Sequence, residues 1–335
     1  MLSESLRLCY SRIRAVFVPE ALRKISSHDF ASPSTRPTAH NDLMLRNGVY
    51  PAAVTPFGES GRVDIASFAR LLAWFEAAGC QGAVLAGTNG EGPSLSAVEK
   101  RDLLRQAVPF KGELDLILGI ATTSCDDAEW LCKQAGRDGA SAVLLMAPFY
   151  FREAGEKGVA AWFELVMSRS PLPVIVYNFP QRTGFTITPE LLARLSRHER
   201  YLGAKDSSGE VSNLAAYRQA TGDRLLFAGN ETLLIQALES EWSGSISGAA
   251  NAVPNWLCQI VLEWFQGDKE SAETKFQIIL PVIERLRQSP QPALNKALLH
   301  RYGVLASPEP RLPLEAVSEA ESCAAADLIR QILGS

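Results

Sequence analysis

The sequence predicts a (β/α)8 barrel followed by a C-terminal helical region, and three features support this fold class. Eight short apolar runs recur at intervals of roughly 20 to 30 residues, and segments with helical spacing lie between them. The runs are continuously apolar rather than alternating, which indicates a parallel sheet with helices outside. An open doubly wound sheet is the competing architecture, but it usually carries a G-x-G-x-x-G turn after its first strand, and none is present.

Each predicted strand is bounded by turn residues or by a predicted helix. In chain order the strand sequences are YPAAVTPF, GAVLAGT, LDLILGIA, AVLLMAP, PVIVYNFP, YLGAKD, LLFAGN and GSISGAA. Two of the intervening helices carry clear end signals. Asp64 is placed to cap the first helix, which Gly79 ends, and Ser96 and Glu99 form the S-x-x-E pattern of a capping box. The segments SCDDAEWLCKQAGRDG and TPELLARLS are similar.

The pattern divides the chain into three parts. Residues 1–45 are first basic and then polar, without regular apolar runs, so we predict a poorly ordered N-terminal extension. An organelle transit peptide is the alternative for this part. Residues 46–270 form the predicted barrel, and residues 271–335 form an appended helical region.

The composition excludes several classes of function. The net charge of -4 gives no reason to expect a nucleic-acid partner, and no apolar run is long enough to cross a bilayer. The 6 cysteines are scattered without a C-x-x-C pair, which favours a reduced, cytoplasmic protein, or an organellar one if a transit peptide is present. No metal-ligand spacing and no G-x-S-x-G motif occurs, so we expect chemistry without a metal or a serine–histidine pair.

The most informative residue is Lys205, which ends the sixth predicted strand in the sequence RYLGAKDSSGE. Active sites of such barrels lie at the carboxyl ends of the strands, so this amine would project into a desolvated mouth. Other lysines, such as Lys100, fall in helical or turn contexts where we expect a solvated ammonium. Burial disfavours the charged form, and a neutral amine can attack a ketone to form a Schiff base. The competing interpretations are a lysine that reaches solvent at a loop and a lysine paired with Asp206.

Polar residues also end the neighbouring strands. Tyr177 could relay protons to an imine or could be an aromatic plug at the top of the barrel. Thr88 could be a turn residue, and Tyr150 a packed loop aromatic. Arg182 suits a substrate carboxylate, although a loop arginine is more often a solvated charge. Each assignment is weak alone, and their coincidence on successive strand ends favours one shared site.

Glycines at the ends of the last two strands support a different chemistry. The sequences AGNE and SGSISGAAN, with Gly229 and residues 244–248, could hold a phosphate on backbone N–H groups. The same glycines could instead allow the close approach of a planar substrate. A catalytically silent barrel that acts as a binding or assembly protein is a further alternative.

Six segments, in this order and spacing, resemble the dihydrodipicolinate synthase and N-acetylneuraminate lyase family of Schiff-base-forming class I aldolases. They are AAVTPF, GTNGEGPSLS, APFYF, VYNFPQRTG, GAKDSSG and FAGNE. The resemblance covers about residues 47–330, and the combination is specific whereas GTNGE or KDSSG alone would not be. It implies a (β/α)8 barrel with C-terminal helices, assembled as a homo-oligomer, usually a dimer of tight dimers. A 2-oxo acid and an aldehyde would be the small-molecule partners, with no cofactor beyond the covalent imine.

The resemblance also implies catalytic roles for individual residues. Lys205 matches the lysine that captures pyruvate or a related 2-oxo acid, and Tyr177 matches the tyrosine above it that shuttles protons. Thr88 and Tyr150 match the partners of a proton relay, in which Tyr150 reaches into the neighbouring subunit's site.

Four further residues would bind substrate by the same resemblance. Asn89 occupies the position where the synthases place a second threonine that contacts the pyruvate carboxylate. Arg182 matches the arginine that receives the carboxylate of the incoming aldehyde, and Gly229 and Ile246 match backbone positions that line the pyruvate pocket.

The match has departures that bear on substrate. The Thr88–Asn89 pair resembles the pattern of 4-hydroxy-2-oxoglutarate aldolases, which generally lack the arginine that is present here as Arg182. We therefore predict a dihydrodipicolinate synthase, with cleavage of 4-hydroxy-2-oxoglutarate or of a 2-keto-3-deoxy sugar acid as the alternative. The residues at positions where lysine-inhibited synthases bind lysine do not match, so feedback by lysine is not expected; they are Ala97, Lys100, Thr123 and Phe149.

Overall fold

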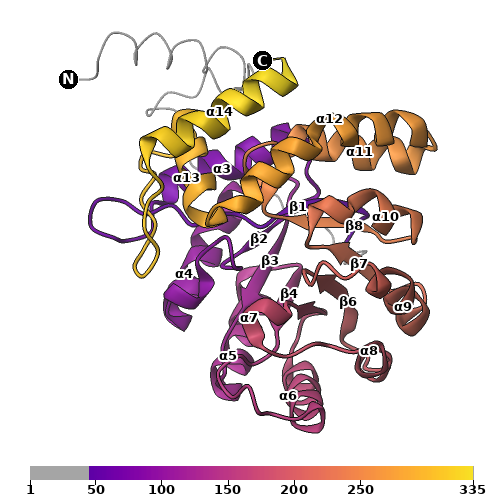
Figure 1. The fold of residues 1–335 in the computed structure, drawn as a ribbon. Coiled ribbons are helices and arrows are strands. Elements are labelled where there is room, and N and C mark those ends of the chain that lie inside the picture. Colours follow the sequence, from indigo (N-terminus) through magenta and orange to yellow (C-terminus); the bar gives the residue numbers. More distant parts are fainter. Residues whose placement is uncertain (1–44, 335) are drawn as a thin grey trace.

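The computed structural model describes residues 45–334, so the N-terminal extension predicted at 1–45 lies outside the described residues except for its last position. Eight parallel strands form a barrel with helices around it (Figure 1). The strands are β1 (Gly48–Pro51), β2 (Gly82–Leu85), β3 (Asp115–Ile120), β4 (Ala142–Met146), β5 (Val174–Asn178), β6 (Tyr201–Asp206), β7 (Leu225–Ala228) and β8 (Gly244–Ser247). The strands pair in chain order from β2 to β8, β8 pairs with β1, and a bridge between Ala52 and Val84 joins β1 to β2. The predicted (β/α)8 barrel is therefore confirmed.

The outer helices alternate with the strands along the chain. They are α3 (Ile65–Ala77), α4 (Ala97–Ala107), α5 (Cys125–Asp138), α6 (Glu156–Arg169), α8 (Pro189–Leu195), α9 (Ser212–Thr221), α10 (Leu234–Glu239) and α11 (Pro254–Gln266). The Asp64 carboxylate accepts the Ser67 N–H at 3.1 Å, and Gly79 after the helix end has a φ of 85°. Both bonds of the capping box between Ser96 and Glu99 are formed, at 3.2 and 2.9 Å.

Side chains alternate between two hydrophobic cores along strands such as β5. On β5, Val174 and Val176 pack into the outer core beneath the helices, whereas Ile175 and Tyr177 belong to the inner core that fills the barrel. Other strands supply the rest of the inner core, including Tyr50, Val84, Ile117, Leu144, Phe227 and Ile246. This alternation decides which residues at the strand ends face the mouth of the barrel.

Three helices follow the barrel: α12 (Lys269–Gln288), α13 (Gln291–Arg301) and α14 (Glu319–Leu333). They lie together at one side of the barrel, coloured orange to yellow in Figure 1. α13 packs against η4 (Ala249–Asn251), the turn that follows β8, and this contact brings α13 to the carboxyl ends of the strands. None of the helices within residues 45–334 is long and apolar enough to cross a membrane.

Candidate active site

Lys205 lies on β6 with its side chain on the inner face of the barrel. It is in register with Tyr177 of β5 and Phe227 of β7, which both belong to the inner core, whereas the preceding Ala204 belongs to the outer core. Only 5% of Lys205 is exposed, and its Nζ lies 4.3 Å from the centroid of the Tyr177 ring. The amine at the end of this strand is therefore held against an aromatic face at the barrel mouth, rather than projecting into solvent.

Asp206 points to the opposite side of the strand and has partners of its own. Its carboxylate accepts four hydrogen bonds of 2.7 to 3.1 Å, from the side chains of Asn178 and Asn213 and from the hydroxyl and backbone N–H of Ser208. These neutral donors satisfy the carboxylate without Lys205. The alternative in which Lys205 is simply paired with Asp206 therefore finds no support in this geometry.

Burial alone does not distinguish Lys205 from the other lysines. Lys100 was expected to be solvated in its helix, but it is buried, and its Nζ donates to the Ala121 carbonyl at 3.4 Å. Burial lowers the pKa of Lys100. The side chain of Lys296 is fully buried as well and forms an ion pair with Glu91. Lys205 differs from both because it lies on the inner face of the barrel at a strand end.

Tyr177, Ser207 and Gly229 surround the Lys205 side chain. The Ser207 hydroxyl donates to the Tyr177 phenol oxygen at 3.3 Å. A Cβ at position 229 would lie 2.1 Å from Ser207 Oγ and 2.7 Å from Lys205 Cε, so the bare backbone of Gly229 packs directly on the lysine stem. These contacts bring the predicted residues Lys205, Tyr177 and Gly229 together, and they add Ser207.

The loop after β2 supplies hydroxyl and amide groups. Thr88 Oγ1 is buried and has no hydrogen-bond partner within the described part of the chain, so it retains its full capacity to bond a ligand. The Asn89 side chain is bonded to α13: Asn295 Nδ2 donates to Asn89 Oδ1 at 3.1 Å, and Asn89 Nδ2 donates to Gln291 Oε1 at 3.4 Å. Sequence analysis missed both α13 residues, because nothing in the chain pattern relates this helix to the second strand.

Arg182 reaches the mouth through a stack of side chains. It lies on the short helix α7 (Pro180–Thr183) and is exposed, with its guanidinium carbon 5.9 Å from the centroid of the Phe179 ring. The Phe179 ring lies 5.8 Å from that of Tyr177. Ile246 is fully buried in the inner core. Tyr150, in contrast, is 74% exposed and lies against Phe151 with a ring separation of 5.2 Å.

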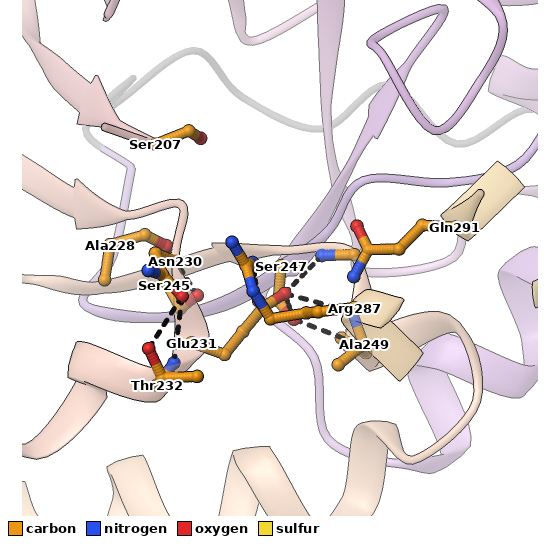
Figure 2. A network of polar contacts seen from close by, with 12 residues as sticks. Ser207, Ala228, Asn230, Glu231, Thr232, Ser245, Ser247, Ala249, Arg287 and Gln291 are labelled. Carbon is orange, nitrogen blue, oxygen red and sulfur yellow. Dashed lines mark hydrogen bonds and ion pairs between the residues drawn. The ribbon is translucent and has the colours of Figure 1, made fainter. Parts of the chain in front are cut away.

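A buried carboxylate closes the rim at β8 (Figure 2). Glu231 is fully buried, and its Oε1 accepts the Ser247 hydroxyl at 2.7 Å and the N–H groups of Gly248 and Ala249 at 2.7 and 3.0 Å. Its Oε2 accepts from Arg287 Nη1 at 3.0 Å. Burial raises the pKa of Glu231, but Arg287 and these donors outweigh it, so the pKa lies below its ordinary value. Glu231 was not among the predicted site residues, although it ends the sequence AGNE that drew attention to this rim.

The Glu231 carboxylate is an argument against a phosphate site at this rim. The backbone donors of Gly248 and Ala249 are bonded to Glu231, and the Gly229 N–H donates to the Asp206 carbonyl at 2.7 Å. A phosphate at this rim would have to displace a buried carboxylate of like charge. The geometry thus disfavours a phosphate at this rim, and the other interpretation, in which these glycines allow the close approach of a planar substrate, stays a prediction. Within residues 45–334, no cluster of three or more His, Cys, Asp or Glu side chains could hold a metal ion.

The fold and the site together define a barrel enzyme of the class I aldolase type, with a strand-end lysine buried beside a tyrosine. The model of the dihydrodipicolinate synthetase family matches residues 45–332, and the chain belongs to this family.

Individual relatives agree with that assignment. The chain is 33% identical over 286 residues to a 4-hydroxy-tetrahydrodipicolinate synthase of Archaeoglobus fulgidus, covering 85% of this chain and 98% of the relative. It is 34% identical over 274 residues to the protein of the same description from Hyphomonas neptunium, covering 81% and 92% of the two chains. The crystal structure of the dihydrodipicolinate synthase of Thermotoga maritima superposes with a TM-score of 0.81 at 27% identity, covering 86% of this chain and 98% of that one.

Proposed function

We propose that this enzyme condenses pyruvate with aspartate semialdehyde through a Schiff base on Lys205, as a 4-hydroxy-tetrahydrodipicolinate synthase. The observation that carries the proposal is the Lys205 amine, 5% exposed at the barrel mouth and 4.3 Å from the Tyr177 ring centroid. The descriptions of relatives at 33% and 34% identity support the choice of substrates. The covalent imine serves as the electron sink, so the proposed reaction needs no separate cofactor.

The proposed chemistry proceeds in five steps. The neutral amine of Lys205 attacks C2 of pyruvate, and the resulting carbinolamine loses water to form the imine. The methyl group then gives up a proton to form an enamine, whose carbon attacks the aldehyde carbon of the acceptor while the aldehyde oxygen takes up a proton. The amino group of the acceptor finally attacks the imine carbon, which closes the ring and releases the Lys205 amine. The Tyr177 hydroxyl is proposed to donate the proton that the leaving water needs and to take one back afterwards. Thr88 Oγ1, which has no hydrogen-bond partner in the described chain, is proposed as its relay partner.

The remaining contacts position the two substrates. Asn89 is proposed to receive the pyruvate carboxylate, and Gly229 and Ile246 to form the pocket wall around it. Arg182 is proposed to bind the carboxylate of the acceptor with its planar fork of donors. Its stack on Phe179, which lies against Tyr177, supports this role because it places the guanidinium beyond the ring that covers Lys205.

Tyr150 is proposed to act in the site of a neighbouring subunit. Tyr150 and Phe151 are 74% and 63% exposed and lie next to one another, which suits a contact between copies of the chain. The proposal therefore includes a homo-oligomer, either a dimer or a tetramer. Light scattering should give at least twice the mass of one chain, and Tyr150→Phe should reduce turnover without changing that mass. A catalytically competent monomer would contradict this assignment.

A cytoplasmic location is proposed as well. The cysteines within residues 45–334 are free thiols, which suits a reducing compartment. An organellar location remains the alternative if residues 1–45 act as a transit peptide. A fluorescent fusion that carries the complete chain would distinguish them, compared with one that lacks residues 1–44.

Cleavage of 4-hydroxy-2-oxoglutarate, or of a 2-keto-3-deoxy sugar acid, is a second candidate. The observation that favours it is Asn89 in place of a hydroxyl residue, held in an amide cluster with Asn295. Both candidate reactions proceed through an imine on Lys205 and differ in the acceptor. A variant of Lys205 therefore does not distinguish them.

Kinetics with both substrate pairs test the choice. The synthase assignment predicts condensation of pyruvate with aspartate semialdehyde at a kcat/KM at least about 100-fold above that for cleavage of 4-hydroxy-2-oxoglutarate. Arg182→Ala should raise the KM for aspartate semialdehyde about 10-fold or more and leave the KM for pyruvate within about 2-fold, since it removes one charged contact to the acceptor. Arg197→Ala serves as the control at an exposed arginine elsewhere. Equal effects on both KM values, or faster cleavage, would contradict the synthase assignment.

A further inference from the structure

We propose that Asn295 of α13 is a positioning residue for the 2-oxo acid, because it fixes the Asn89 amide with its nitrogen available to the substrate carboxylate. The inference rests on the proposed function, since the carboxylate that it concerns is that of pyruvate. It assigns the C-terminal helical region a part in substrate recognition, beyond covering the barrel.

The orientation of the Asn295 amide follows from its partners. Asn295 is fully buried, and its Nδ2 donates to the Gly248 carbonyl at 2.9 Å and to Asn89 Oδ1 at 3.1 Å. A carbonyl oxygen can only accept, so Gly248 determines which end of the Asn295 amide faces it. The second N–H of the same nitrogen meets Asn89, which must therefore present its oxygen there and turn its own nitrogen away.

The Gly248 carbonyl is itself held in place. The Gly248 N–H donates to the buried Glu231 carboxylate at 2.7 Å, and Glu231 is bonded to Arg287 at 3.0 Å (Figure 2). The Gly248 carbonyl also accepts from Asn251 Nδ2 at 2.9 Å. The Gly248 carbonyl, which orients the Asn295 amide, is thus part of a hydrogen-bonded network that resists rearrangement.

A buried ion pair fixes α13 against the loop that carries Asn89. Lys296, the residue after Asn295, pairs with Glu91, and both side chains are fully buried. Glu91 lies two residues after Asn89 and has a left-handed φ of 54°. Its Oε2 accepts the backbone N–H of Arg311 at 2.7 Å. The helix and the loop therefore cannot slide past one another without breaking a buried charge pair.

The donors left over at this point are suited to a carboxylate. Asn89 Nδ2 makes one long contact of 3.4 Å, to Gln291 Oε1. Gln291 Nε2 is buried and has no partner in the described chain. Buried donors without acceptors are costly, and the oxygens of a bound carboxylate would satisfy them. The buried Asn295 Oδ1 is an acceptor without a partner in the described chain. The cluster contains no cation, so the proposed recognition of the carboxylate is by hydrogen bonds alone.

A purely structural role for the amides is the competing explanation. In that case Asn295 would only attach α13 to the barrel, and its loss would weaken binding of any ketone to the same extent. The two roles differ in their dependence on the substrate's charge. Pyruvate carries a carboxylate, whereas methyl pyruvate has the same ketone beside an uncharged ester.

The test compares both ketones in borohydride trapping of the imine, with adduct measured by intact-protein mass spectrometry. Asn295→Asp replaces the donor by an acceptor, which reverses the preferred orientation of the Asn89 amide and turns its oxygen towards the carboxylate. The half-saturating pyruvate concentration should rise about 10- to 100-fold, the size expected for a hydrogen bond to a charged group. For methyl pyruvate the change should stay below about 3-fold. Asn255→Asp, at an exposed position of α11, controls for the added negative charge.

A second variant covers the case in which Asn295→Asp does not fold. Asn295→Leu removes the donor at similar size, and the Gly248 carbonyl keeps its bond from Asn251. It should raise the half-saturating pyruvate concentration about 3- to 10-fold, with the same selectivity for the charged ketone. Equal changes for pyruvate and methyl pyruvate, or none, would overturn the inference. If the unmodified enzyme traps no pyruvate, the proposed function itself fails, and that outcome is distinct.

Discussion

Gly229 provides the sharpest test of how the barrel makes room for its lysine. An alanine Cβ at this position would lie 2.7 Å from Lys205 Cε, 2.1 Å from Ser207 Oγ and 2.9 Å from the Asp206 carbonyl oxygen. The Ser207 hydroxyl can rotate away, but the Asp206 carbonyl accepts the Gly229 N–H and is fixed by the sheet. The lysine stem must therefore move.

The distance that Lys205 Cε must move determines how much imine formation should slow. Lys205 Cε would have to retreat from 2.7 Å to an ordinary contact of 3.4 Å, a shift of about 0.7 Å. A misplacement of about 1 Å can slow an oriented reaction about 100-fold, so we expect imine formation in Gly229→Ala to slow by roughly 10- to 100-fold. Overpacking should also lower the free energy of unfolding by about 1–3 kcal/mol.

The assay is the rate of borohydride-trapped adduct at saturating pyruvate, together with urea unfolding of the same samples. Gly158→Ala in α6 is the matched control, because no atom beyond its chain neighbours and its own helix backbone lies within 4 Å of the added Cβ. It should leave trapping unchanged and stabilise the helix by about 0.5–1 kcal/mol. A folded Gly229→Ala enzyme that traps pyruvate at the unmodified rate would refute the reasoning.

Three further predictions concern stability, each read from urea unfolding. Lys296→Met leaves the Glu91 carboxylate buried without its cation, so the free energy of unfolding should fall by about 3–5 kcal/mol. Adding Glu91→Gln to this variant should restore part of the lost stability. If the losses of the two single variants simply add in the double variant, a direct pairing is contradicted. The pKa of Glu231 is lower in the folded state than the ordinary 4.5, so its ionisation stabilises the fold above about pH 4.5, and this contribution is lost as the pH falls through the folded pKa. The stability advantage over Glu231→Gln should therefore be present at pH 7 and shrink in acid, and a constant difference would count against it. Ser96→Ala should cost about 0.5–2 kcal/mol through loss of the capping box, and a neutral result would show that the cap contributes nothing.

Local patterns in the sequence were sufficient for the barrel. Continuous apolar runs predict buried parallel strands, and the capping signals at Asp64 and Ser96 are formed as expected. The position of Lys205 at a strand end was also predicted, because it directly follows an apolar run. The inward direction of its side chain was not, because β6 departs from strict alternation: Leu202 belongs to the inner core and Ala204 to the outer core.

The rest of the site depends on contacts between distant segments. The glycines after β7 and β8 predicted a phosphate site equally well, and only the fold shows that Glu231 occupies the backbone donors of Gly248. The Asn295 amide meets Asn89 across 206 positions of chain, so no periodicity or spacing could relate them. Tyr150 lies exposed on the surface of one chain, and its proposed partner belongs to another copy.

Reduction with borohydride in the presence of pyruvate, followed by peptide mapping, tests the central claim most directly. The account predicts one adduct per chain, on the peptide that contains Lys205, and no adduct in Lys205→Ala. The other buried lysines within residues 45–334, Lys100 and Lys296, should remain unmodified. An adduct located on either of these, or an unmodified Lys205 in folded enzyme that still turns over pyruvate, would contradict the proposal.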